Sequence, residues 1–304
     1  LEKLGLPVII KARSGGGGKG MRLVEDMDDL KRQFDSARKE AQNAFGDSGV
    51  YIEKYIKSPL HIEVQLMADE HGNVIHLGAR DCSLQMNHQK VIEEAPPEGV
   101  DQETLDRLYE TSVRAAKSVS YTSVGTIEYL LDQDGSYYFM EMNTRIQVEH
   151  PITEMVTGID IVRDQVLIAC GERLAYKQED ILIRGHAIEC RINAYDSDNN
   201  FLPSVGKIQA LNIPGGYGVR VDSAIYQGYE VLPFYDSMLA KVISYGRDRK
   251  EAIRIMNRAL EEFVVEGVKT NIGFNLKLIN DPVFIENKYD TSYLERSIDD
   301  TRPL

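Results

Sequence analysis

The chain has 304 residues, 42% of them hydrophobic, which is enough for a sizeable core and for more than one domain or subdomain. Its formal net charge of -13 disfavours general attraction to nucleic acid or to an anionic membrane. Three cysteines without CxxC spacing argue against a disulfide framework or thiolate metal site and favour core packing in a reducing compartment. No apolar run approaches the roughly 20 residues that span a bilayer, so a cytoplasmic protein is expected.

The first 56 residues predict a small α+β unit. Its expected order is strand, glycine-rich loop, strand, helix and strand, over residues 6–12, 15–20, 20–24, 26–46 and 50–56. Asp26 is suited to cap the helix and Gly46 to end it. The chain enters this pattern without an initiator methionine, so we expect an internal piece of a longer polypeptide.

The rest of the chain predicts antiparallel strands with a few covering helices. Strands are expected at 61–69, 74–82, 126–132, 137–143 and 184–194, and helices at 103–118, 160–169 and 248–263. Gln133, Asp134 and Gly135 give the clearest hairpin signal, between the third and fourth of these strands. Several short strands punctuated by glycine and proline follow residue 194.

The glycine-rich loop has the composition of a phosphate-binding loop. Four consecutive glycines at 15–18 let backbone N–H groups approach phosphate oxygens, and Lys11 and Lys19 supply positive charge. The loop joins two strands and Met21 stands where a Walker motif needs Ser or Thr, so a Walker-type NTPase is disfavoured. A surface hairpin without a ligand is the alternative for this loop alone.

Two carboxylates face each other across the predicted hairpin. The residue opposite Glu128 is Met140 or Glu141, so Glu128 and Glu141 can lie on one face, and Asn143 falls on the same face. Neighbouring carboxylates repel unless they are exposed, protonated or bridged by a cation, and Mg²⁺ prefers such oxygen ligands. The alternative is a solvated polar face.

Polar residues continue at every other position to residue 149. An extended backbone would place Glu141, Asn143, Arg145, Gln147 and Glu149 on one side. Arginine offers a planar fork for a carboxylate or bicarbonate, and a glutamate can accept a proton. The strand at 184–194 similarly places Glu189, Arg191 and Asn193 on one face, where the arginine could stabilise an oxyanion. An ordinary amphipathic edge strand remains the alternative.

Taken together, these segments resemble the biotin carboxylase family over essentially the whole chain. The resemblance is carried by KARSGGGGKGMR (11–22), EKYI (53–56), RDCSLQMNHQKVIEEAP (80–96), EMNTRIQVEHPITEM (141–155) and GHAIECRIN (185–193). It implies an α+β, ATP-grasp fold in which a small lid closes over nucleotide held against a larger antiparallel sheet. The implied regions are a truncated lid at 1–56, a core with the MgATP and bicarbonate site at 57–180, and the biotin carboxylase C-terminal region at 181–304.

The resemblance also assigns the nucleotide and metal ligands. The implied ligands of magnesium (or manganese) are Glu128, Glu141 and Asn143. The residues implied to contact ATP are Lys11, Gly15, Gly16, Gly17, Gly18, Gly20, Met21, Glu53, Lys54, Ile56, His61, Gln85, His88 and Leu130. Met86 and Asn87 depart from the family, which often has basic residues there, so this turn adds less charge than usual.

The remaining assignments concern bicarbonate and biotin. Arg145, Gln147 and Val148 are implied to cradle bicarbonate, and Glu149 to act as the base. Arg191 and Lys90 are implied to bind biotin, and both count with Arg145 and Glu149 as catalytic. The implied reaction is an ATP-dependent ligase step in which bicarbonate, activated as carboxyphosphate, carboxylates biotin.

The resemblance places this reaction in a larger assembly. The implied partners are a biotin carboxyl carrier, a carboxyltransferase such as that of acetyl-CoA carboxylase, and a second copy of the full-length subunit. Pyruvate, propionyl-CoA and other acyl-CoA carboxylases stay open, as do a carbamoyl-phosphate-type ligase and an inactive nucleotide-binding fragment. The family's N-terminal domain is expected to be missing from this chain.

Overall fold

The computed structural model describes residues 4–14, 21–86, 89–197 and 199–299. It divides into two compact units. The small unit comprises Leu1–Pro59 with Met86–Gln89, and the large unit comprises Leu60–Gln85 with Lys90–Leu304. Among the described residues, none of the helices combines the length and apolar character needed to cross a bilayer.

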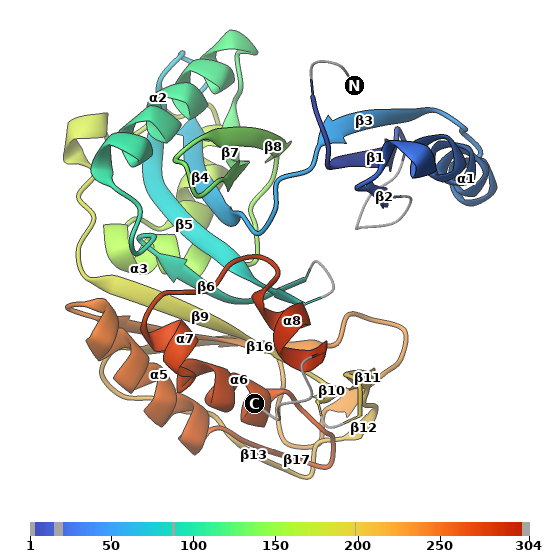
Figure 1. The fold of residues 1–304 in the computed structure, drawn as a ribbon. Helices are drawn as coiled ribbons and strands as arrows, with labels where there is room; N and C mark the ends of the chain where they lie inside the picture. The colour runs from blue at the N-terminus through green and yellow to red at the C-terminus, as the bar shows by residue number, and fades with distance from the viewer. Residues whose placement is uncertain (1–3, 15–20, 87–88, 198, 300–304) are drawn as a thin grey trace. The chain divides into compact units, whose positions relative to one another are not determined.

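The small unit is a three-stranded sheet with one helix against it (Figure 1). The sheet has the order β2-β1-β3, all antiparallel, and its elements are β1 (Val8–Ala12), β2 (Met21–Val24), α1 (Met27–Phe45) and β3 (Val50–Lys54). The Asp26 carboxylate accepts the Asp28 N–H at the start of α1, and Gly46 ends the helix with a left-handed backbone, φ 71°. The predicted hairpin and capped helix are therefore confirmed, whereas residues 15–20 lie outside the described residues.

The large unit is built on one eight-stranded sheet. Its order is β14-β16-β9-β6-β5-β4-β7-β8. The strands are β4 (Leu60–Ala68), β5 (Val74–Met86), β6 (Gln89–Ala95), β7 (Ser123–Leu131), β8 (Tyr137–Asn143), β9 (His186–Asn193), β14 (Val219–Ser223) and β16 (Met238–Gly246). Separate from this sheet are three two-stranded ribbons made from β10 (Tyr195–Asp196), β11 (Leu202–Pro203), β12 (Gly206–Lys207), β13 (Ala210–Asn212), β15 (Glu230–Val231) and β17 (Val264–Glu266).

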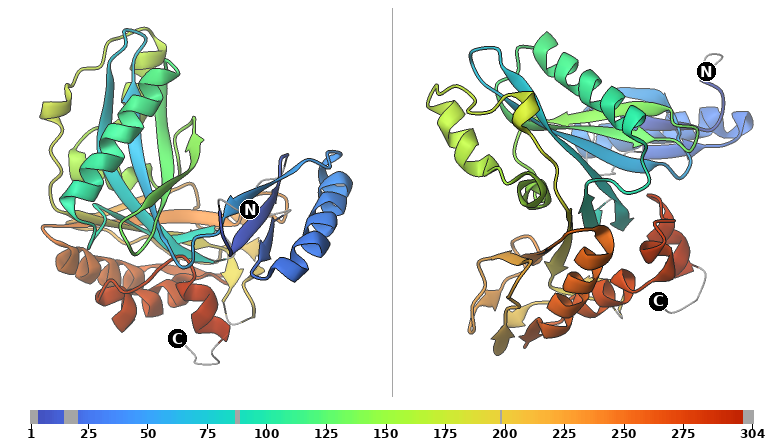
Figure 2. Two further views of the ribbon diagram at one scale, coloured as in Figure 1. Left: turned by 45° about the horizontal axis from the view of Figure 1, so that its top comes forward. Right: turned by 90° about the vertical axis from the view of Figure 1, so that its left-hand side faces the viewer.

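The large unit also contains helices, several of which pack against its sheet. They are α2 (Gln102–Ser118), α3 (His150–Thr157), α4 (Ile161–Ala169), α5 (Arg249–Glu262), α6 (Ile272–Ile279), α7 (Pro282–Ile285), α8 (Tyr293–Asp299) and a short 3-10 turn at Gln178–Asp180. Figure 2 shows α2 running across the face of strands β4 and β7. These elements confirm the predicted strands, hairpin and helices and the α+β class.

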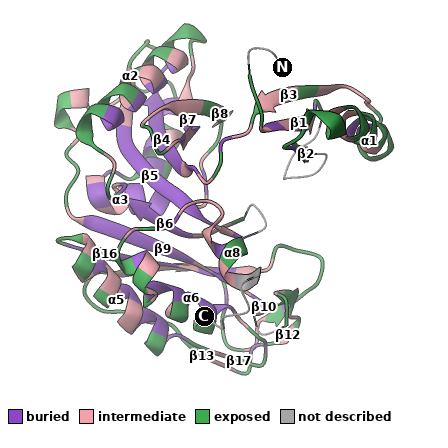
Figure 3. Cartoon of the chain, viewed as in Figure 1, coloured by how far each residue is buried: buried purple, intermediate pink, exposed green. Residues whose placement is uncertain are grey.

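Burial explains why the central strands carry the site. Ile62, Val64 and Leu66 of β4 pack against Leu105 and Leu108 of α2, so the alternate residues of β4 point to the opposite face. Figure 3 shows β4 as buried along its length, and the residues at those alternate positions, His61, Glu63 and Gln65, are polar. Cys82 and Cys190 pack in the core as expected, but Cys170 is exposed, at the end of α4.

Candidate active site

A row of ionisable side chains crosses four adjacent strands of the large sheet. Glu63 of β4 stands opposite Arg80 of β5 on one side and Glu128 of β7 on the other. Glu128 in turn stands opposite Glu141 of β8. Directly opposed residues in antiparallel strands project to the same face, so the four side chains lie next to one another. The register predicted for the Glu128 and Glu141 pair is confirmed.

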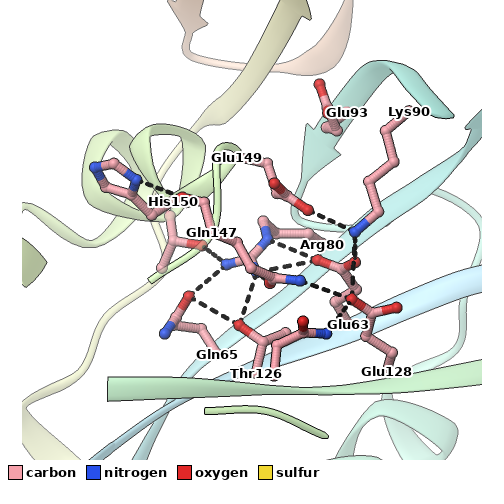
Figure 4. Close-up of polar contacts among 12 residues, drawn as sticks. Glu63, Gln65, Arg80, Lys90, Glu93, Thr126, Glu128, Gln147, Glu149 and His150 are labelled. Atoms are coloured by element: carbon pink, nitrogen blue, oxygen red, sulfur yellow. Dashed lines mark hydrogen bonds and ion pairs between the residues drawn. The ribbon is translucent and has the colours of Figure 1, made fainter. Parts of the chain in front are cut away.

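Arg80, at the β5 end of this row, is the donor for several of the surrounding side chains (Figure 4). Its side chain is fully buried, and its nitrogens donate to Glu63 Oε2 at 3.0 Å, Gln65 Oε1 at 2.7 Å and Gln147 Oε1 at 2.8 Å. Burial alone would lower the pKa of Arg80, but the charges of Glu63 and Glu149 and the hydrogen bond to Glu63 together raise it. A buried cation needs such partners, so Arg80 fixes the segment before α3 against the sheet.

Glu149 lies between two cations. Lys90 Nζ is 2.6 Å from Glu149 Oε1, and Arg191 Nη2 is 3.0 Å from Glu149 Oε2. Glu149 is the N-cap residue of α3, yet its carboxylate makes no capping hydrogen bond because it turns to these cations. Lys90 also pairs with Glu63, and this anionic surrounding raises the pKa of Lys90 despite burial. The Glu149 carboxylate, held at both oxygens by cations, is thus a candidate proton acceptor.

Glu128 is a hydrogen-bond partner of four side chains, one of which is Lys90, whose Nζ lies 3.4 Å from Glu128 Oε1. Its Oε1 accepts from Asn143 Nδ2 at 2.8 Å and from Gln147 Nε2 at 2.6 Å, and its Oε2 lies 2.9 Å from His61 Nε2. Burial would raise the pKa of Glu128, but the His61 hydrogen bond and the Lys90 charge lower it to about 2. The carboxylate is therefore ionised across the physiological range.

Glu128, Glu141 and Asn143 fit a divalent cation. The Asn143 amide nitrogen is 2.8 Å from an oxygen of Glu128 and 3.0 Å from one of Glu141, so both carboxylates converge on one hydrogen-bond donor. Turning that amide would add its oxygen, giving the hard oxygen donors that Mg²⁺ prefers. His61, Glu63 and Glu128 also come together, but Lys90 and Arg80 already neutralise the charge there.

The predicted extended row from 141 to 149 is wrong beyond Asn143. Strand β8 ends at Asn143, and α3 begins at His150 with Pro151 in its first turn. Proline fixes a φ that suits a helix start, so the chain turns at this point instead of continuing as a strand. Gln147 and Glu149 are folded into the core, 5% and 2% exposed.

Arg145 and Val148 consequently lie apart from the row. The Arg145 side chain is exposed, and its Nη1 donates to the Ile146 carbonyl oxygen at 3.2 Å. The Val148 carbonyl accepts from Lys241 Nζ at 2.8 Å. Among the described residues, the cation beside Gln147 is therefore Arg80, and the cations beside Glu149 are Lys90 and Arg191.

The described residues implied to bind nucleotide fall into two groups. In the large unit, Gln85 Nε2 is 2.5 Å from His61 Nδ1, and Leu130 stands opposite His61 across β4 and β7. In the small unit, Lys11 Nζ pairs with Glu53 Oε2 at 2.5 Å and Lys11 stands opposite Met21, while Lys54 ends β3 and Ile56 is buried. The predicted ligands Gly15, Gly16, Gly17, Gly18, Gly20 and His88 lie outside the described residues.

Sequence reasoning missed three members of the site: Glu63, Arg80 and Glu93. The signal was present in β4, where His61, Glu63 and Gln65 alternate with apolar residues. That is the pattern that drew attention to residues 141–149. It was overlooked because a strand with a polar face is ordinarily taken to face water, whereas this polar face is buried.

Two family models cover most of the chain. Residues 1–177 match the carbamoyl-phosphate synthase L chain ATP-binding domain, and residues 189–296 match the biotin carboxylase C-terminal domain. Biotin carboxylase 1 of Bacillus subtilis is 52% identical over 295 residues, covering 97% of this chain. The chain spans 66% of that relative, just under two thirds of its length.

Solved structures of biotin carboxylases are also similar to this chain. A Campylobacter jejuni biotin carboxylase in complex with a beta-gamma-ATP ligand matches with a TM-score of 0.93 and 50% identity, over 97% of this chain and 66% of that one. The biotin carboxylase domain dimer of Hydrogenobacter thermophilus 2-oxoglutarate carboxylase, bound to MgADP, ADP and bicarbonate, also matches with a TM-score of 0.93. Its identity is 46%, over 100% of this chain and 67% of that one.

Proposed function

The chain belongs to the biotin carboxylase family, with its ATP-grasp fold, and on that premise we propose that it catalyses ATP-dependent carboxylation of biotin within its full-length protein. The observation that carries the proposal is the buried Glu149 carboxylate held between Lys90 and Arg191, beside the acidic pair Glu128 and Glu141. A base, two cations and a candidate cation site thus share one sheet face.

The proposed first step activates bicarbonate. Glu149 takes the bicarbonate proton while a bicarbonate oxygen attacks the γ-phosphorus of ATP, which releases ADP and forms carboxyphosphate. Lys90 and Arg191, which hold Glu149, offer positive charge to the anion. Glu128, Glu141 and Asn143 would hold Mg²⁺, which would neutralise phosphate charge when bound. Arg145, whose Nη1 contacts the Ile146 carbonyl oxygen, has further N–H groups that would bind the bicarbonate.

The proposed second step transfers carbon dioxide. Carboxyphosphate breaks its C–O bond to the phosphate and gives CO₂ and phosphate. The phosphate then takes the proton from the biotin ureido nitrogen, and that nitrogen forms the new bond to CO₂. Arg191 is suited to hold the ureido oxygen as negative charge develops on it, because a guanidinium gives paired donors.

The nucleotide contacts are part of the same proposal. In the large unit, the proposed ATP contacts are His61, Gln85 and Leu130. In the small unit, they are Lys11, Met21, Glu53, Lys54 and Ile56. The resemblance also assigns ATP contacts to the glycines of residues 15–20 and to His88, which lie outside the described residues. The proposed partners are a biotin carrier, a carboxyltransferase and a second copy of the full-length subunit. The acceptor of the carboxyl group stays open, because relatives of this chain include a domain of a 2-oxoglutarate carboxylase and the acceptor is chosen elsewhere.

The test is bicarbonate-dependent ATP cleavage in the full-length protein, with and without free biotin. Glu149→Gln should lower the biotin-dependent rate by about 10²- to 10⁴-fold, the usual range for removing a general base. Glu179→Gln is the control, since that side chain is 71% exposed on the surface. An unchanged rate in the Glu149→Gln variant would refute the proposal, and cleavage that needs ammonia in place of biotin would identify a carbamoyl-phosphate-type ligase.

A further inference from the structure

Two buried carboxyl groups stand opposite each other beside the candidate active site. Glu93 of β6 pairs in register with Glu189 of β9, and both side chains are 0% exposed. Directly opposed residues on antiparallel strands have Cβ atoms about 4.5–5.5 Å apart. Among the described residues, Glu93 Oε2 and both carboxyl oxygens of Glu189 have no hydrogen-bond partner. The reaction proposed above uses neither residue.

The two carboxyl groups have different neighbours. Glu93 Oε1 accepts a hydrogen bond from Arg191 Nε at 2.6 Å. The charges of Glu149 and Lys90 also affect the pKa of Glu93. The pKa of Glu189 is affected by the charges of Glu93, Lys241, Arg191 and Glu149, but Glu189 makes an ion pair with none of them. Lys241 instead donates to the Val148 carbonyl oxygen and lies 3.7 Å from Asp222.

This asymmetry decides which of the two groups carries a proton. Ionising both buried carboxyl groups at this separation would cost free energy, because each carboxylate loses its hydration and repels the other. Burial raises the pKa of Glu93 to about 7, although Arg191 opposes the rise, and burial raises the pKa of Glu189 well above its ordinary value. The carboxyl group without a cationic partner is the one that stays protonated.

The ionised partner fixes the orientation of Arg191. Glu93 holds the Nε edge of the guanidinium, and this leaves Nη2 directed at Glu149, 3.0 Å away. A guanidinium is planar, so an acceptor at one edge determines where the remaining N–H groups point. Among the described residues, Arg191 forms ion pairs with Glu93 and Glu149. Without Glu93, it would keep Glu149 as its one acidic partner.

We propose that Glu93 is a positioning residue that holds Arg191 toward Glu149, and that Glu189 is its neutral, proton-bearing neighbour. The effect of Glu93 on catalysis rests on the function proposed above. The assignment of the proton to Glu189 does not depend on that function. The two carboxyl groups should therefore respond differently to the same Glu-to-Gln substitution, because an amide replaces a neutral acid better than it replaces an anion.

The proton is tested by infrared spectroscopy on the full-length protein at mildly alkaline pH. We expect a carbonyl stretch from a protonated carboxyl group that disappears in Glu189→Gln and persists in Glu93→Gln. Absence of the band in the unmodified protein, or its loss only in Glu93→Gln, would overturn the assignment. This measurement needs no catalytic activity, so its failure is distinct from failure of the proposed function.

The positioning role is tested by kinetics. Glu93→Gln should lower kcat for biotin-dependent ATP cleavage by about 10- to 100-fold, as expected for a misplaced catalytic group, and should raise KM for biotin while leaving KM for ATP unchanged. Glu93→Asp should recover part of the loss. Glu189→Gln should stay within about twofold of the unmodified enzyme. If the unmodified enzyme is active and Glu93→Gln matches it, the positioning role is wrong.

Discussion

Glu94 illustrates how one residue can make stability depend on pH. It is adjacent to Glu93 but points to the other face of β6, where His186 Nε2 lies 2.7 Å from its Oε2. Arg249 donates to both of its oxygens at 2.8 Å, and the Tyr289 hydroxyl donates to Oε1 at 2.8 Å. Burial would raise the pKa of Glu94, but the hydrogen bonds from His186 and Arg249 lower it from 4.5 to about 2.

This shift predicts acid sensitivity. A carboxyl whose pKa is lower in the folded state contributes stability that is complete above its unfolded pKa of 4.5 and is lost as pH falls toward 2. The contribution is about 3 kcal/mol at neutral pH. In urea unfolding, the gap in unfolding free energy between the unmodified chain and Glu94→Gln should shrink as pH falls through this window. Exposed Glu98→Gln is the control, and a gap that stays constant with pH would contradict the prediction.

The sequence predicted some residue contacts and not others. The pairing of Glu128 with Glu141 followed from a hairpin with an unambiguous turn at Gln133 to Gly135. Glu63 and Arg80 meet through strands whose two faces are both buried, and alternation alone does not distinguish a buried polar face from a solvated one. The Glu93 and Glu189 pair joins strands nearly a hundred residues apart, so only the sheet order brings them together.

At the scale of secondary-structure elements, the junction of β8 and α3 was the place where periodicity misled. The alternation of residues 141–149 suits a strand, but Pro151 marks a helix start two residues later. Ending the strand at Asn143 separates Arg145 from Gln147 and brings Glu149 to the N-terminus of α3. The elements with caps at both ends, such as α1, were predicted more closely because their caps are local.

Helix α5 provides a prediction about a cap. The Asp248 carboxylate accepts the Glu251 N–H at 2.8 Å at the start of α5, whose buried face, Ala252, Met256, Ala259 and Leu260, contacts β16 and β9. Asp248→Ala should cost about 1 kcal/mol of unfolding free energy because it leaves a helix N–H without its acceptor. Urea unfolding should show a lower midpoint at an unchanged slope.

Asp248→Asn is the matched variant, because asparagine caps about as well as aspartate. It should retain nearly all of the stability that Asp248→Ala loses. Equal losses in the two variants would mean that the charge of Asp248, and not its hydrogen bond, stabilises α5.

At the scale of the whole molecule, one continuous sheet connects residues that the sequence separates widely. Strands β9, β14 and β16 from the C-terminal part join β4 to β8 in the same eight-stranded sheet. Lys90, Glu149 and Arg191, which come from three distant segments, can meet only because of this sheet. The division at residues 1–56, 57–180 and 181–304 stays a prediction based on resemblance, since periodicity does not determine which strands share a sheet.

The small unit has a core of its own, and this predicts separate opening. Val8, Ile10, Val24 and Ala37 form one buried cluster within it. Ile10→Ala should cost about 2–5 kcal/mol through lost contacts and an unfilled cavity. Since compact units with separate cores can open separately, hydrogen exchange should quicken at the amides of β1 and β3 and stay unchanged at those of β4 and β7.

Ile127→Ala is the reciprocal variant, because Ile127 is buried in the core of the large unit with Ile62 and Leu108. It should quicken exchange in β4 and β7 and leave β1 and β3 unchanged. Leu23→Ala, at a side chain 40% exposed on β2, controls for loss of a hydrophobic residue without loss of a core. If Ile10→Ala quickened exchange equally in both units, the chain would open as one cooperative structure, and the boundary near Pro59 would have no energetic meaning.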